Sequence, residues 1–295
     1  MTDILQADPV ARSAASDAER AARAAGVHVR ELAGIDEQSA VVRLLAEIWG
    51  RSLDNPPLPP ELLRAFGKAG NYISGAYAGD ELVGATVGFH SMPERHALHS
   101  HIAGVSTGHL GRSVGYAMKL HQRAWALAHG VDVIEWTFDP LVARNAYFNI
   151  AKLRAMPAEY LANFYGPMTD AINGDDDTDR LLVRWMLRDP EVVAAASGHG
   201  QAVDPNAPGV ATVAVPDDIE RLRLSDPSEA RRWRAEVRER LGELLAAGGV
   251  VVGFARGAGY IVRVEASAPS APSAPRSRVH REAECTECTE KESRQ

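Results

Sequence analysis

One stretch of the sequence, residues 97–129, constrains the fold more than any other. An apolar run that favours a β-strand, with Leu98, Ile102 and Val105, leads into a turn with regularly spaced glycines. Apolar residues then recur at helical spacing, at Val114, Ala117, Met118, Ala124, Trp125 and Ala128. The pattern therefore predicts a strand over 97–105, a glycine loop, and a helix that runs to His129.

This succession of elements predicts a phosphate site. Gly108, Gly111 and Gly115 would let the backbone approach a ligand closely. The N–H groups and the dipole at the start of a helix favour an anion. Arg112 adds a positively charged fork whose geometry suits phosphate oxygens.

The run Arg112-x-x-Gly115-x-Ala117 resembles a motif of the GCN5-related N-acetyltransferase (GNAT) superfamily, which lies between its fourth strand and third helix. That family uses the motif to hold the pyrophosphate of acetyl-CoA. The later runs 136–141 and 143–153 resemble one branch of uncharacterised acetyltransferases of the superfamily, and the likeness covers about residues 27–264. The resemblance implies acetyl-CoA as co-substrate, in contact with Gly104, Val105, Ser106, Gly111, Arg112, Ser113, Val114, Gly115, Tyr116, Ala117 and Asn145.

The order of the other elements agrees with this resemblance. We expect an α/β (α+β) fold with a central mixed, mostly antiparallel twisted sheet flanked by helices, and a small C-terminal α/β extension. The sequence predicts strands at 27–32, 72–78, 81–89, 97–105, 131–138, 160–165 and 181–186. It predicts helices at 36–48, 61–68, 114–129 and 140–153.

Composition divides the chain into five predicted segments. We expect a disordered arm at 1–25, a GNAT-like acyltransferase domain at 26–188, a linker at 189–208, an extension that packs on the main domain at 209–265, and a disordered tail at 266–295. The extension would contain a strand at 210–215, a charged helix that ends near 247, and a hairpin at 250–264.

Charge and hydropathy exclude several classes of partner. The net charge of −7 argues against binding of nucleic acid through bulk electrostatics. No apolar run approaches the roughly 20 residues that a membrane-spanning helix needs, and no secretion signal is visible, so we expect a cytoplasmic protein. The two cysteines, Cys285 and Cys288, lie in the tail, which leaves the predicted domains without thiol chemistry. The oligomeric state stays open, because the charged helix could pack internally or on a partner.

Two histidines are the candidate general base of an acyl transfer. His99 and His101 are two residues apart on a predicted strand, so their side chains share one face. An imidazole that titrates near neutrality can take a proton from an attacking amine. The alternative is a pair of hydrogen-bonded surface or core histidines. A metal site is a weaker interpretation, because Glu135 is the only obvious third ligand, and we predict no metal.

Tyr147 is the candidate general acid for the departing thiolate. The resemblance implies a tyrosine in this helix, four residues after an alanine, and Ala143 and Tyr147 keep that spacing. Alignment on Lys152 and Leu153 instead places Ile150 at the tyrosine position. The alternative role for Tyr147 is an aromatic side chain that packs the helix onto the sheet. Asp139 is expected to cap its helix, and residues 174–180 are expected to form a solvated turn.

These residues predict an acyl-CoA-dependent N-acyltransferase, with acetyl-CoA as the expected donor. The reaction would proceed by direct attack in a ternary complex, because the predicted domains contain no cysteine that could carry an acyl group. The acceptor would be an amine on a small molecule, otherwise unidentified. The alternative is a GNAT-fold protein that binds acyl-CoA as a sensor or scaffold without turning it over.

Overall fold

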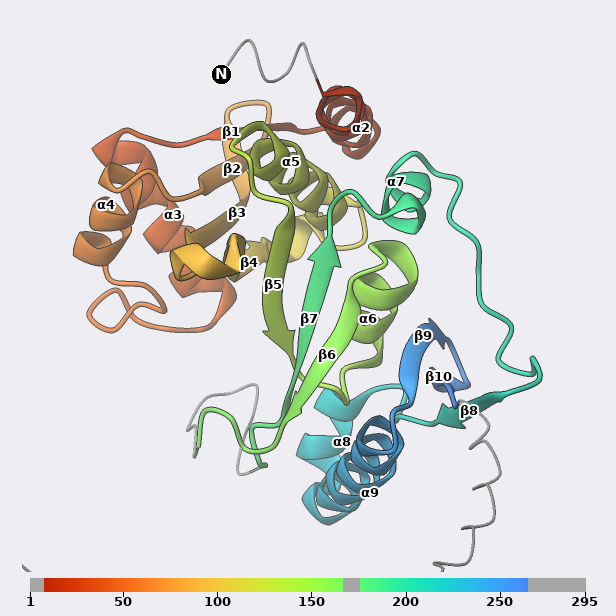
Figure 1. The fold of residues 1–295 in the computed structure, drawn as a ribbon. Coiled ribbons are helices and arrows are strands. Elements are labelled where there is room, and N and C mark those ends of the chain that lie inside the picture. Colours follow the sequence, from red (N-terminus) through yellow and green to blue (C-terminus); the bar gives the residue numbers. More distant parts are fainter. Residues whose placement is uncertain (1–7, 167–175, 265–295) are drawn as a thin grey trace, which may run out of the picture. The chain divides into compact units, whose positions relative to one another are not determined.

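A seven-stranded mixed sheet forms the centre of the computed structural model, which describes residues 8–166 and 176–264 (Figure 1). The strand order is β1-β2-β3-β4-β5-β7-β6, and every neighbouring pair is antiparallel except the parallel pair β4–β5. The predicted fold class is therefore confirmed. The strands are β1 (His28–Glu31), β2 (Ile73–Ala78), β3 (Glu81–His90), β4 (Ala97–Val105), β5 (Val133–Phe138), β6 (Met156–Leu161) and β7 (Arg180–Met186).

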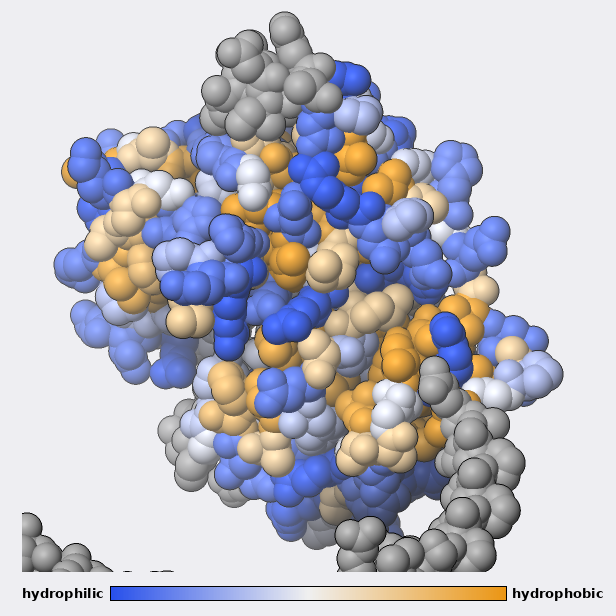
Figure 2. Space-filling view, in the orientation of Figure 1, coloured by the Kyte–Doolittle hydropathy of each residue, from blue (hydrophilic) through white to orange (hydrophobic). Residues whose placement is uncertain are grey.

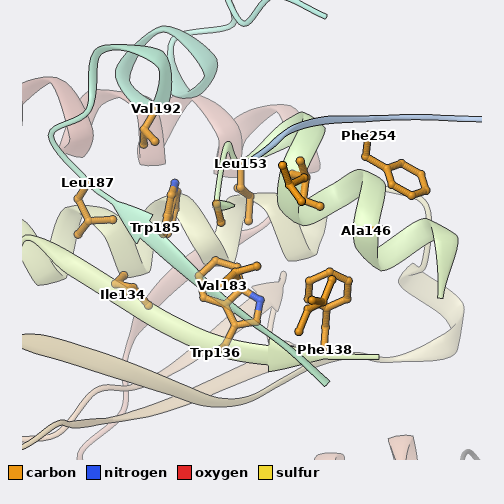
Figure 3. Packing of buried hydrophobic residues seen from close by; sticks show 14 of the residues in the cluster. Ile134, Trp136, Phe138, Ala146, Leu153, Val183, Trp185, Leu187, Val192 and Phe254 are labelled. Carbon is orange, nitrogen blue, oxygen red and sulfur yellow. The ribbon is translucent and has the colours of Figure 1, made fainter. Parts of the chain in front are cut away.

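Helices cover both faces of this sheet. One face packs on α3 (Ile35–Ile48) and α4 (Pro60–Lys68) through a buried cluster that includes Leu45, Leu63 and Val87. The other face packs on α5 (Val114–Ala128) and on α6 (Ala143–Ala146), which continues as the π-helical segment η3 (Tyr147–Lys152). Figure 3 shows the second core, where Trp136 and Trp185 from neighbouring strands meet edge to face with ring centroids 6.0 Å apart.

The expected mobile arm at 1–25 is wrong for residues 9–25, which form helix α2 (Pro9–Ala25). Asp8 caps its first turn and Pro9 occupies the first helical position, a favourable start for a helix. Ala11, Ala14 and Ala18 are buried where α2 packs on α5. Because these side chains are small, α2 packs closely on α5 without a large apolar face.

The predicted linker at 189–208 also contains a helix, α7 (Pro190–Ala196), capped by Asp189. Val192 anchors it in the core. Two further boundaries move: the helix predicted from 140 begins at 143, and the strand predicted at 160–165 lies at 156–161. The structure therefore contains two helices that the composition of their segments concealed.

The C-terminal extension contains a three-stranded antiparallel sheet, β8-β10-β9, and two helices. It belongs to the same compact unit as the main sheet. Phe254 of β9 joins the core that contains Ala146 (Figure 3), and hydrophobic surface gathers over β9 (Figure 2). The predicted tail with Cys285 and Cys288 lies outside the described residues. The extension's elements are β8 (Val210–Val213), α8 (Ile219–Ser225), α9 (Pro227–Ala246), β9 (Val250–Ala255) and β10 (Gly259–Arg263).

Candidate functional site

The parallel strands β4 and β5 separate part-way along their length. Three residue pairs join them, and the last is His99 with Glu135. Beyond that pair β4 continues to Val105 on the β3 side, while β5 continues to Phe138 on the β7 side. Each strand therefore turns an edge of unpaired backbone groups toward the other. Such groups need hydrogen-bond partners, and a ligand that lies in an extended conformation can supply them.

The glycine loop lies at the end of β4 and is not filled by its own side chains. A Cβ atom built at Gly108 or Gly111 meets nothing within 4 Å, and Gly111 has φ +78°. Ser113 begins α5 with a left-handed φ of 63°, and no side chain caps the helix. Arg112 is exposed, and no ion pair joins it to another described residue. First-turn N–H groups without a cap, beside an exposed guanidinium, suit a diphosphate.

Of the other predicted contact residues, some lie beside the glycine loop and some are engaged in contacts elsewhere. Gly104 lies against α3, since a Cβ atom there would be 2.7 Å from the Trp49 ring. The amide of Ser106 donates to the Val83 carbonyl at 2.8 Å, so it is already engaged. The Tyr116 hydroxyl donates to the Ala195 carbonyl of α7 at 3.2 Å, and Asn145 is exposed on α6. Val105 ends β4, and Ser113, Val114, Gly115 and Ala117 form the start of α5 after the loop, where the Val114 and Ala117 side chains are buried in the core.

His99 and His101 lie together where β4 and β5 begin to separate. Both rings pack against Phe89, with centroids 5.0 and 5.6 Å away, on the face of the sheet that α4 covers. His101 is the extra residue of a β-bulge in β4. Burial, together with the nearby charges of His101 and Lys119, lowers the pKa of His99, and burial lowers that of His101. Neutral imidazoles at neutral pH can accept a proton.

Glu135, the third ligand of the metal interpretation, is engaged in ion pairs. Its Oε1 accepts from Arg184 Nε at 2.8 Å, and Arg95 lies 4.0 Å from its other oxygen. Within residues 8–166 and 176–264, no group of three metal-ligating side chains comes together. The structure thus gives Glu135 the role of an ion-pair acceptor beside His99.

Tyr147 lies on η3 and faces the C-terminal extension. The guanidinium of Arg256, from the turn between β9 and β10, lies 4.4 Å from the centre of its ring, and Lys152 lies 5.9 Å away. Both cations contact the aromatic face, a favourable cation–π geometry. The role of Tyr147 as a general acid stays a prediction, and so do the catalytic roles of the two histidines.

Lys119 is a residue at this site that the sequence analysis missed. It lies on α5 and is 6% exposed, and its Nζ donates to Ser100 Oγ at 2.8 Å and to Gln122 Oε1 at 3.2 Å. Nζ also lies 3.9 Å from the centre of the Trp136 ring. Burial lowers the pKa of Lys119 to about 7. The only local signal was a lysine directly after Met118 on a helix that is apolar on most sides.

An ionic cluster of four aspartates and three arginines joins the end of β5 to the extension. The expectation that Asp139 caps its helix is wrong, because α6 begins at Ala143 with Val142 as its N-cap and without a side-chain cap. Asp139 Oδ1 instead accepts from the Leu141 amide of the preceding loop, and the carboxylate accepts from Arg234 at 2.7 and 2.9 Å. Burial alone would raise the pKa of Asp139, and bonds from Arg234 and Arg223 outweigh it and hold the value at about 2. The full cluster is Asp139, Asp176, Asp177, Asp179, Arg223, Arg234 and Arg238.

This cluster corrects the expectation of a solvated turn before β7. Asp176 is 9% exposed and Asp179 is fully buried. Asp179 accepts from the Tyr160 hydroxyl at 2.6 Å and from Arg238 at 2.6 Å. Residues 174 and 175 of the predicted turn lie outside the described residues. The acidic run is thus a docking element for α9.

A mixed sheet whose one parallel pair separates beside a glycine loop is the arrangement that the sequence resemblance leads us to expect. Similar solved structures include a GNAT-family acetyltransferase from Streptococcus pneumoniae, at 12% identity, a TM-score of 0.43, and coverage of 54% of this chain and 97% of that one. An N-acetyltransferase from Staphylococcus aureus Mu50 has 13% identity, a TM-score of 0.45, and coverage of 55% and 99%. These likenesses concern the fold and assign no activity.

A diaminobutyrate acetyltransferase from Paenibacillus lautus, solved with L-2,4-diaminobutyric acid and coenzyme A, is similar at 19% identity and a TM-score of 0.43. The match covers 55% of this chain and 96% of that one. No protein-family model and no curated protein matches the sequence. No helix in the described part of the chain is both long and apolar enough to cross a bilayer.

Proposed function

We propose that this protein is an acyl-CoA-dependent N-acyltransferase that uses acetyl-CoA and an amine acceptor by direct attack in a ternary complex. The observation that carries the proposal is the open glycine loop, with an uncapped helix start and exposed Arg112, at the point where β4 and β5 have separated. Acetyl-CoA supplies an acyl group activated as a thioester. The cytoplasmic location stays a prediction from the sequence.

The residues of this chain divide the chemistry between the two faces of the sheet. Amides of the first turn of α5 and the Arg112 guanidinium bind the diphosphate. His99, neutral because of its lowered pKa, accepts the proton of the attacking amine on the face that α4 covers. Tyr147 is the proposed donor of a proton to the departing thiolate. The acceptor is specified only as an amine.

Replacement of Arg112 is expected to weaken acetyl-CoA binding. Arg112→Ala removes a charged donor to the diphosphate and should cost about 1–3 kcal/mol of binding free energy. Isothermal titration measures the effect, and Arg240→Ala, at an exposed position of α9, is the matched control, expected to bind as the wild type does. Equal affinity for Arg112→Ala and the wild type would remove this arginine from the site. No binding to the wild type at millimolar acetyl-CoA would remove the proposed function itself.

Replacement of His99 is expected to slow transfer rather than binding. With an acceptor found in an amine panel, His99→Gln should lower kcat by about 10²–10⁴-fold and leave the acetyl-CoA affinity unchanged. Because the pKa of His99 is lowered, the wild-type rate should rise with pH through a value below its usual 6.5 and then level off. Free-thiol release measured across pH checks both. A His99→Gln profile that keeps the same acidic limb would assign that limb to another group.

A non-catalytic acyl-CoA-binding protein is the second candidate. It is favoured by the position of Tyr147, whose ring is covered by Arg256, and by the engaged amide of Ser106. Thiol release with an amine panel separates the two functions: turnover with any amine supports the enzyme, and tight binding without turnover across the panel supports the sensor.

A further inference from the structure

Lys119 is a buried cation in an arginine-rich chain, and within residues 8–166 and 176–264 it has no carboxylate partner. The 32 lysines and arginines of the sequence include only four lysines: Lys68, Lys119, Lys152 and Lys291. The ionic cluster of the extension uses arginine at every cationic position. Among the described residues, no ion pair reaches Lys119, whose partners are Ser100, Gln122 and Trp136. Arginine stays charged in proteins, whereas a buried lysine can lose its proton and become a nucleophile.

The position of Lys119 is as specific as its chemistry. Its partner Ser100 follows the last paired residue of β4, and its partner Trp136 follows the last paired residue of β5. Its Nζ therefore bridges the two strands at the closed end of their separation. Ser100 is five residues before Val105 and the glycine loop, about 17 Å along a strand, a span that an extended pantetheine arm can cover.

We propose that Lys119 is a site of self-acylation, at which bound acyl-CoA transfers its acyl group to Nζ when no acceptor amine is present. The inference rests on the proposed function, because it needs an acyl-CoA in the separation of β4 and β5. It is independent of the roles of His99 and Tyr147. It adds a covalent modification site on the α5 face of the sheet, opposite the face that carries the two histidines.

The step balances without a further reagent. The neutral Nζ attacks the thioester carbonyl carbon, a C–N bond forms, and the C–S bond breaks with its electron pair on sulfur. The proton that Nζ loses passes to the sulfur and leaves a free CoA thiol, and Ser100 Oγ, 2.8 Å from Nζ, is placed to relay it. The product is a neutral amide at Lys119. Burial, which lowers the pKa of this amine to about 7, supplies a neutral fraction at neutral pH.

Peptide mass spectrometry after incubation with acetyl-CoA tests the proposal. We expect one acetyl group on Lys119 and little on the three other lysines. A water-soluble N-hydroxysuccinimide ester of acetic acid is the matched reagent control: it should label exposed Lys68 before buried Lys119, so the order of labelling reverses between the two donors. Arg112→Ala should lower the labelling by acetyl-CoA in proportion to its lost affinity, and Lys119→Arg should abolish the label at this position.

The outcomes separate this inference from the proposed function. Binding of acetyl-CoA without a label on Lys119 overturns the inference and leaves the proposed function standing. Absence of both binding and label overturns both. A label on Lys119 that Arg112→Ala does not reduce, or that the succinimide ester reproduces in the same order, also overturns the inference, because it shows chemical labelling without a bound donor.

Discussion

Arg234→Met is expected to lower the free energy of unfolding by about 3–5 kcal/mol, since it leaves two buried carboxylates without their main cation. Arg234 Nη2 contacts Asp139 at 2.9 Å and Asp176 at 2.9 Å, and its side chain is 4% exposed. Chemical denaturation at neutral pH measures the loss. Arg231→Met on the exposed side of α9 is the matched control, expected to change the free energy of unfolding by less than about 0.5 kcal/mol.

The pH dependence of the same variant gives a second readout. The pKa of Asp139 is held at about 2 in the folded protein, below its unfolded value near 3.9. The ion pair therefore stabilises the wild type fully above about pH 4, and this contribution is lost as the pH falls toward 2. The difference in stability between wild type and Arg234→Met should shrink over that window. A difference that stays constant there, or a loss below about 1 kcal/mol at neutral pH, would contradict the role given to Arg234.

Lys119→Met is expected to change how stability depends on alkaline pH. The pKa of Lys119 is about 7 in the folded protein and about 10.4 in the unfolded chain. Between these values the unfolded state binds more protons, so wild-type stability gains about 3–4 kcal/mol from this group between about pH 7 and pH 10. The variant lacks that gain. Below about pH 7 the charge is present in both states of the wild type, and the two curves should run parallel.

Denaturation curves of both proteins across this range check the prediction. Subtracting one curve from the other cancels the other titrating groups. The groups around Lys119 are Ser100 and Gln122, which do not titrate in this range, and His99, which titrates at lower pH. Parallel curves up to about pH 10 would mean that Lys119 keeps an ordinary pKa, and the chemical basis of its self-acylation would then be absent.

Local patterns predicted the main sheet and the glycine loop because their determinants lie close together in the sequence. The run from 97 to 129 contains the strand, the turn and the first helix turns that make the site. Helix α2 was missed because its buried face consists of three alanines and an aspartate, Asp17, with no large apolar side chain. Its start signal was present, since Asp8-Pro9 and Asp189-Pro190 match Asp226-Pro227, the pair at which α9 begins.

Long-range contacts account for the rest of the difference. Asp139 and Arg234 are 95 residues apart, so neither has a neighbour in the sequence that indicates an ion pair. The acidic run at 176–179 was interpreted as solvated because isolated carboxylates favour water. Lys119 gave a similarly weak signal, since a lysine on a helix is exposed in most proteins. Its burial depends on how α5 sits over two strands that come from separate parts of the chain.

The parting of β4 and β5 after a single short ladder has a consequence for how this molecule tolerates mutation. Whatever lies between the strands meets peptide N–H and C=O groups, and these are the same for every amino acid except proline. Recognition by the main chain survives the exchange of side chains that point away from the gap. Specificity for a particular ligand must then depend on the few side chains that border the gap. Substitutions elsewhere in the two strands should affect packing more than binding.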